Sequence, residues 1–208
     1  MTKELLIGVL GLQGDIEENI QVTNNVLTDM KLDGTAISVR YPEQIIRVDG
    51  LIIPGGESTV MGILMAFNLK LYDIIKKRLD DHLPIMGTCA GMILLAREAY
   101  ERTLGKKKQL LLGGLDIEVE RNSFGRQNNS FESNLSIDGI GENFKGVFIR
   151  APSVKSTGAE VQILSKFDGK IVAVRQNNII GTSFHPELSG DNRLHKEFVE
   201  SIITWKKF

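Results

Sequence analysis

The sequence predicts an α/β protein built on an open, mostly parallel sheet, with antiparallel strands added in the C-terminal part. In the first half of the chain, short buried runs of strand length alternate with segments whose apolar residues recur at helical spacing. From residue 115 the pattern changes to shorter alternating runs, which are typical of antiparallel strands. With 208 residues and no internal repeat, low-complexity tract or linker, the chain is expected to form one domain, residues 1–208.

The N-terminal half begins with a β-α-β pattern. Residues 5–12 are a nearly continuous apolar run, as expected of a strand that is covered on both faces. Asp15 can cap the helix that follows, and residues 37–39 are the second expected strand. Residues 50–53 predict a third strand, which ends in the glycine loop of residues 54–59.

The next segments lead to the only cysteine. Apolar residues return at positions 60–64, and those from 71 to 83 predict one face of an amphipathic helix. Residues 84–96 then predict a short buried strand, a turn and a helix that begins directly after Cys89. Because sites in open parallel sheets gather at the carboxyl ends of strands, we expect Gln13, the glycine loop and Cys89 on one rim.

The C-terminal part is expected to hold the antiparallel strands and a last helix. The runs suited to strands are residues 115–120, 147–149, 161–164, 171–175 and 179–184. The last two predict a hairpin, because only Gln176, Asn177 and Asn178 separate them. Asp191 can cap the last helix, on which we interpret His195 and Trp205 as structural. Residues 101–109, with lysines at 106–108, are interpreted as a solvated loop, because no aromatic residue accompanies the charges.

Composition excludes several classes of partner and points to an ordinary globular protein. Lys and Arg number 25 against 26 Asp and Glu, so no overall field attracts nucleic acid or an anionic membrane. A single Cys cannot form an intramolecular disulfide, and the N-terminus lacks the design of a signal peptide. A cytoplasmic location is therefore expected.

Cys89 lies in a Gly-x-Cys-x-Gly frame, the thiol counterpart of the nucleophile elbow of Gly-x-Ser-x-Gly hydrolases. A cysteine at a helix N-terminus faces free N–H groups and the positive end of the helix dipole, which both favour the reactive thiolate. From this stretch alone, an inert cysteine packed among small residues remains an equal alternative.

His185 and Glu187 supply the groups that a nucleophilic thiol needs. Proline at 186 favours extended geometry at His185, and residues two apart on a strand project to the same side. An imidazole can hold the thiol proton, and a carboxylate on its other nitrogen fixes the tautomer and the orientation. We therefore interpret Cys89, His185 and Glu187 as a catalytic triad. Metal or cofactor binding is not expected, since the histidines lack ligand spacing and Gly55-Gly56 lacks the lysine of a P-loop.

At this point the chain resembles the triad glutamine amidotransferases, which carry the same elbow and a late His-Pro-Glu. More narrowly, it resembles the glutaminase subunits of ribose-5-phosphate-dependent pyridoxal 5'-phosphate synthases. The motifs that carry the resemblance are residues 8–14, 54–59, 87–91, 120–127, 148–152 and 183–187. The resemblance implies a three-layer fold of the class I glutamine amidotransferase type (flavodoxin-like). It also implies hydrolysis of L-glutamine, with ammonia passed to a synthase subunit in a hetero-oligomeric complex.

By the same resemblance, Cys89 is the nucleophile, His185 the acid and base, and Glu187 the residue that orients His185. The N–H groups of Gly56 and Ala90 are the implied oxyanion donors. The residues implied in substrate binding are Gly55, Gly56, Glu57, Arg121, Ile149 and Arg150.

Three questions remain open at the level of sequence. Either Arg121 or Arg150 could bind the α-carboxylate of glutamine. Alternatively, both arginines form surface salt bridges at strand ends. The chain could serve another amidotransferase synthase. A cysteine hydrolase or chaperone of the elbow-cysteine class is a rival, although there a histidine commonly follows the cysteine and here Ala90 does. A non-catalytic binding module would have no reason to keep the triad residue types.

Overall fold

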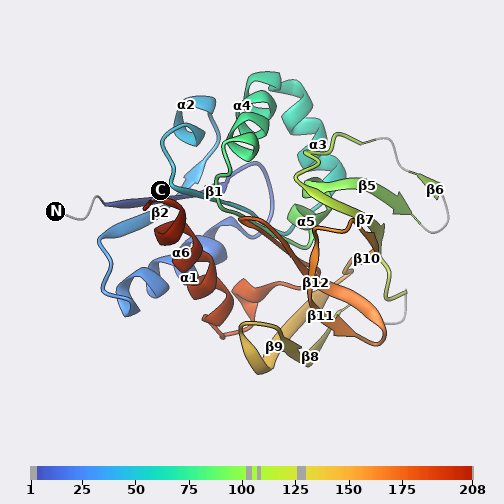
Figure 1. The fold of residues 1–208 in the computed structure, drawn as a ribbon. Coiled ribbons are helices and arrows are strands. Elements are labelled where there is room, and N and C mark those ends of the chain that lie inside the picture. The colour runs from blue at the N-terminus through green and yellow to red at the C-terminus, as the bar shows by residue number, and fades with distance from the viewer. Residues whose placement is uncertain (1–3, 102–104, 107–108, 126–129, 208) are drawn as a thin grey trace.

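The computed structural model describes residues 4–101, 105–106, 109–125 and 130–207, which form a three-layer structure around a twisted sheet (Figure 1). The elements are β1 (Leu5–Leu10), α1 (Ile16–Asp29), β2 (Gly34–Val39), α2 (Pro42–Ile45), β3 (Gly50–Ile53), α3 (Ser58–Phe67), α4 (Leu69–Asp80), β4 (Ile85–Thr88), α5 (Ala90–Leu95), β5 (Ala96–Glu101), β6 (Gly105–Lys106), β7 (Leu115–Arg121), β8 (Ser130–Ile137), β9 (Gly141–Ile149), β10 (Ser153–Thr157), β11 (Gln162–Phe167), β12 (Lys170–Gln176), β13 (Ile179–Thr182), the 3-10 turn η1 (Pro186–Leu188) and α6 (Arg193–Trp205).

The main sheet has a parallel half and a mixed half. Its strand order is β2-β1-β3-β4-β13-β12-β10-β7-β5-β6, and β11 pairs with β12 off this path. Pairing is parallel from β2 to β13 and becomes antiparallel at β12, which confirms the predicted combination of strands. The described strands β8 and β9 form a separate two-stranded sheet. Because β1, β3, β4 and β13 run the same way, their carboxyl ends meet at one edge.

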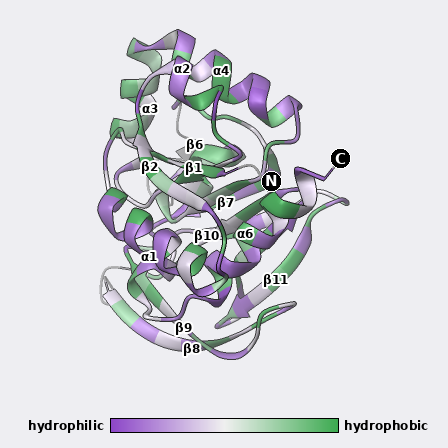
Figure 2. Cartoon of the chain, turned by 90° about the vertical axis from the view of Figure 1, so that its left-hand side faces the viewer, coloured by the Kyte–Doolittle hydropathy of each residue, from purple (hydrophilic) through white to green (hydrophobic). Residues whose placement is uncertain are grey.

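Each face of the parallel half is covered by its own layer. On one face, α3, α4 and α5 bury side chains such as Met61 and Leu94 against the sheet. On the other, α1 and α6 bury Leu27 and Phe198, and the β8-β9 sheet extends this layer (Figure 1). Figure 2 shows hydrophobic and hydrophilic residues alternating along α1, α4 and α6, as expected of helices with one buried face. Within the described residues no single helix is long and apolar enough to span a membrane, although α3 and α4 pass that test together as a pair bent by 106°.

Most predicted elements are present close to their expected positions. The hairpin is formed by β12 and β13, and α5 begins at Ala90, directly after the cysteine. The strands β5, β8 and β10 were not predicted. Within the segment expected to be a loop, Gly105–Lys106 pairs with β5 as β6, while residues 102–104 and 107–108 lie outside the described residues.

The two predicted helix caps differ in geometry. Asp15 occupies the N-cap position of α1, but its side chain makes no capping hydrogen bond. Asp191 lies one residue before the N-cap of α6, and its Oδ1 accepts a hydrogen bond from the Arg193 N–H at 3.0 Å. Asp15 is therefore the N-cap residue, as predicted, but its side chain does not cap the helix.

His195 is completely buried on α6, in keeping with a structural role. Its Nε2 lies 3.3 Å from Asn19 Oδ1, and its Nδ1 has no hydrogen-bond partner among the described residues. Burial lowers the pKa of His195 to about 4 from the ordinary 6.5. The folded protein therefore holds this imidazole neutral at any pH well above 4.

We expect His195 to make the fold sensitive to acid. Between pH 6.5 and 4 the unfolded chain binds a proton at this histidine and the folded chain does not, so the free energy of unfolding falls by up to about 3 kcal/mol. His195→Gln should remove this part of the pH dependence in urea unfolding at pH 7 and pH 4.5. His82→Gln, at an exposed histidine, is the matched control and should retain it. An unchanged pH dependence in the His195 variant would contradict the assignment.

Candidate active site

The elbow at Cys89 is a strained turn between β4 and α5. Cys89 has φ 49° and ψ −101°, a conformation that L side chains rarely adopt. A Cβ at position 91 would collide with the carbonyl oxygen of Ile53, so the turn needs glycine there. The thiol is buried, and its Sγ lies 3.9 Å from the carbonyl oxygen of Ile149. The fold therefore fixes the sulfur at the carboxyl edge of the sheet, as the sequence predicted.

His185 follows β13, whose parallel pairing with β4 brings it to the same edge. Its Nδ1 lies 2.9 Å from Glu187 Oε1, and the side chains of both residues are buried. Glu187 reaches the imidazole from the 3-10 turn η1 and not, as expected, from an extended strand. The predicted contact between His185 and Glu187 is present, but the 3-10 turn that begins at Pro186 produces it.

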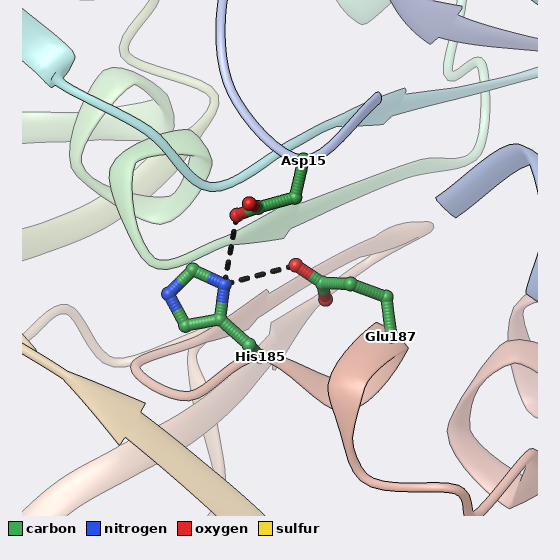
Figure 3. Close-up of side chains that lie close together, drawn as sticks. All are labelled: Asp15, His185 and Glu187. Carbon is green, nitrogen blue, oxygen red and sulfur yellow. Dashed lines mark hydrogen bonds and ion pairs between the residues drawn. The ribbon is translucent and has the colours of Figure 1, made fainter. Parts of the chain in front are cut away.

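A second carboxylate lies at the same ring nitrogen. Asp15 Oδ2 is 3.1 Å from His185 Nδ1, so two carboxylates converge on one N–H group (Figure 3). The sequence predicts Asp15 only as a helix cap, so its contact with His185 was not expected. The available signal was its position: it follows β1 at the rim where the site was expected.

The charges around His185 favour its protonated form. Burial alone would lower the pKa of His185, but hydrogen bonds that the ring donates toward Asp15, Cys89 and Glu187 outweigh it and raise the pKa to about 12. The hydrogen bond with His185 lowers the pKa of Asp15, whereas burial raises the pKa of Glu187. Because Nδ1 faces the carboxylates, Nε2 is the nitrogen left for Cys89. At neutral pH the site therefore holds an imidazolium beside Cys89 Sγ.

A cavity of about 320 Å³ opens beside Cys89 and His185. It is lined by Gln13, Gly14, Asp15, Gly56, Glu57, Ser58, Cys89, Ile93, Arg121, Asn122, Ile149, Arg150 and His185. The predicted site residues therefore line one cavity, except for Gly55, Ala90 and Glu187, which are not among its lining residues. Residues 126–127 of the predicted motif 120–127 lie outside the described residues.

Opposite charges form one wall of the cavity. Arg121 Nη2 lies 2.9 Å from Glu57 Oε1, and Arg121 Nη1 donates to Thr59 Oγ1 at 3.1 Å. The Glu57 carboxylate also accepts the N–H groups of Thr59 and Val60, which caps α3. Arg121 thus forms a salt bridge inside the cavity wall. Arg150, whose φ of 44° is again unusual, lies at the same cavity.

The loop after β1 holds the glycine loop after β3. The Asp15 N–H donates to the Gly55 carbonyl at 3.2 Å, and Gln13 Oε1 accepts from the Glu57 N–H at 2.7 Å. The peptide between Gly55 and Gly56 is trans, so its N–H points opposite to its carbonyl. Because the carbonyl faces the Asp15 N–H, the Gly56 N–H points away from Asp15. Gly56 has φ 153°, which suits glycine and few other residues.

The cluster of Asp15, His185 and Glu187 also has the composition of a metal site. One ligand atom from each lies within 4.8 Å of the others, and nitrogen and carboxylate oxygen are ligands of zinc. Both short distances to Nδ1 are those of hydrogen bonds, so a proton alone accounts for the arrangement.

Comparisons with known proteins agree with this geometry. Residues 9–204 match the SNO glutamine amidotransferase family. The chain is 49% identical, over 97% of its length and 98% of the relative's, to the pyridoxal 5'-phosphate synthase subunit PdxT of Nitrosopumilus maritimus (strain SCM1). It is 44% identical to the PdxT subunit of Pyrococcus furiosus, over 95% and 98% of the two chains.

Solved structures give the same result for the fold. A crystal structure of a glutamine amidotransferase superposes with a TM-score of 0.82 at 41% identity, and the match covers 94% of this chain and 98% of the other. A glutamine amidotransferase from Thermotoga maritima has a TM-score of 0.62 at 9% identity, covering 99% and 86%, which shows a shared fold alone. The predicted class I glutamine amidotransferase fold is confirmed.

Proposed function

Because this chain belongs to the SNO glutamine amidotransferase family, we propose that it is the glutaminase subunit of a pyridoxal 5'-phosphate synthase. It hydrolyses L-glutamine to L-glutamate and ammonia. The observation that carries the proposal is the convergence of Cys89 and His185 on one cavity at the carboxyl edge of the sheet. A cytoplasmic location is part of the proposal.

In the first half of the reaction, Cys89 attacks the side-chain amide carbon of glutamine as the thiolate, whose proton the His185 imidazolium already holds. The negative charge that develops on the amide oxygen is held by the N–H groups of Ala90 and Gly56. Ala90 opens α5, where first-turn N–H groups have no partner within the helix. The His185 imidazolium then gives its proton to the departing nitrogen, and ammonia leaves behind a cysteinyl thioester.

In the second half, His185 is neutral and acts as a base. It takes a proton from water, the hydroxide attacks the thioester carbon, and the tetrahedral intermediate expels the Cys89 thiolate. Glutamate leaves, and the imidazolium and thiolate are restored. Glu187 orients the ring throughout, because it holds the Nδ1 proton.

The cavity wall suits the amino-acid end of glutamine. An α-amino acid carries an ammonium and a carboxylate close together, and Glu57 and Arg121 present the complementary charges 2.9 Å apart. Gly55, Gly56, Ile149 and Arg150 complete the proposed substrate site. The backbone groups of Gly56 and Ile149 fix the position of the side-chain amide, and Arg150 adds a second cation. Gly55 supports the site from its loop, where its carbonyl accepts from the Asp15 N–H.

Ammonia is proposed to pass to the synthase subunit that partners this chain, in a hetero-oligomeric complex. The test is glutamate release from glutamine by the purified chain, alone and with a pyridoxal 5'-phosphate synthase subunit, together with incorporation of ¹⁵N from the glutamine side chain into the product. If glutamate is released but no ¹⁵N enters the product, the chain is a glutaminase that serves another synthase. If the chain hydrolyses other substrates that a cysteine thiolate can attack, and not glutamine, the rival assignment as a cysteine hydrolase is favoured.

Arg150→Ala is expected to raise KM for glutamine by about tenfold with little change in kcat, since a hydrogen bond to a charged group contributes about 1.5–3 kcal/mol. Steady-state kinetics of the folded variant measures this. Lys145→Ala, which removes a cation from β9 outside the cavity lining, should leave both constants unchanged. A fall in kcat alone would contradict substrate binding by Arg150.

A further inference from the structure

We propose that Asp15 is a second positioning carboxylate for His185, acting on the same ring nitrogen as Glu187. The inference rests on the proposed function and deepens it. Asp15 is a positioning residue, since it acts on the reaction through His185.

Asp15 forms an ion pair with the ring nitrogen to which Glu187 is hydrogen-bonded. The two carboxylate oxygens lie 3.1 Å and 2.9 Å from Nδ1, and they reach it from different elements (Figure 3). Asp15 comes from the start of α1 and its side chain is 32% exposed, whereas the Glu187 side chain is fully buried in η1. The chain thus brings two carboxylates, positioned independently, to one ring nitrogen.

The backbone of Asp15 is held on both sides. Its N–H donates to the Gly55 carbonyl at 3.2 Å, and its carbonyl accepts from Asn19 Nδ2 at 2.7 Å. Asn19 is completely buried, and its other side-chain atom faces the buried His195. These contacts fix the direction of the Asp15 side chain without using its carboxylate.

Gly55 makes the approach of Asp15 to His185 possible. A Cβ at this position would lie 2.7 Å from both Asp15 Oδ2 and His185 Nδ1, and it would collide with His185 Cε1. Position 14 also requires glycine, because a Cβ added there would collide with the Gly55 carbonyl. The two glycines therefore allow the loops after β1 and β3 to close over the imidazole.

Two acceptors on Nδ1 have two effects. They fix the plane of the ring so that Nε2 faces Cys89, and they stabilise the imidazolium. The titratable groups that face His185 are Asp15, Glu187 and Cys89. Glu57, Arg121 and Arg150 lie further along the same cavity. Because Asp15 and Glu187 share one task, loss of either leaves the other in place.

The first test is a double-mutant cycle on glutamine hydrolysis. Asp15→Asn and Glu187→Gln should each lower kcat/KM by about tenfold, whereas the double variant should lose about 10⁴-fold, because no carboxylate then holds the ring. Glu18→Gln, at an exposed carboxylate of the same helix, is the matched control and should match the wild type. A double variant no worse than Glu187→Gln would overturn the proposal.

The second test needs no catalytic activity, so it stands even if glutamine is not the substrate. In a Cys89→Ala chain, which removes the coupled thiol, NMR of the imidazole nitrogens reports the pH midpoint of His185. Adding Asp15→Asn should lower this midpoint by about one pH unit or more, while adding Glu18→Gln should leave it unchanged.

The Cys89→Ala chain also allows a measurement in which Asp15 itself is not substituted. In the Cys89→Ala chain, the ¹³C shift of the Asp15 carboxylate should titrate together with His185, because the two share a proton. A His185 midpoint that is insensitive to Asp15→Asn, or an Asp15 shift that does not follow His185, would overturn the proposal. Absence of glutaminase activity together with these titrations would overturn only the proposed substrate.

Discussion

Cys89→Ala is expected to reduce glutamine hydrolysis by about 10⁴-fold or more, because it removes the only group that can form the thioester. The fold should remain intact. The side chain is buried but small, and alanine at φ 49° carries the same backbone strain as cysteine. The measurements are glutamate release and the midpoint of urea unfolding.

Covalent labelling provides the control for this prediction. A glutamine analogue with an electrophilic side chain should label the wild-type chain once, at Cys89, the only cysteine of the sequence. The Cys89→Ala chain should take up no label. Modification of any other residue, or glutaminase activity that survives in the alanine variant, would contradict the role of Cys89 as nucleophile.

His185→Asn is expected to lower kcat by about 10³-fold or more, since neither the departing ammonia nor the attacking water then has a proton-transfer partner. Asparagine keeps a polar side chain beside Glu187 and Asp15, so the buried carboxylates are not left entirely without a donor. Single-turnover measurement of thioester formation and breakdown shows whether both steps slow.

His82→Gln is the control for His185→Asn, because His82 is exposed and lies outside the cavity lining. It should leave kcat unchanged. If His185→Asn slowed only thioester breakdown, another group would have to protonate the departing ammonia.

The parts of the site that could be predicted from the sequence are those made by neighbouring residues. Cys89 and its two glycines form a strand-turn-helix unit, and His185 and Glu187 are two residues apart. Local geometry decides such units, so their residue types and spacing are informative. Asp15 could not be identified in this way, because its contact with His185 depends on how β1 and β13 are placed in the sheet.

The same distinction explains the missed strands. Residues 96–101 (Ala-Arg-Glu-Ala-Tyr-Glu) are mostly good helix formers, and they form β5 because β7 offers a parallel partner. The strand β8 is mostly polar, so its residues lack the apolar run that indicates a strand, and it is defined by its pairing with β9. In both places tertiary pairing overrides local preference.

The position of β13 has a consequence for the growing chain. This strand lies between β4 and β12 in the sheet but follows both of them in the chain, and it carries His185 to the rim. During translation, β1, β3, β4 and Cys89 are therefore made first. His185, the base that works with the cysteine, is made much later. The nucleophile and its base can meet only after β13 and His185 have been made. A nascent chain that has not reached His185 therefore holds the cysteine without its base.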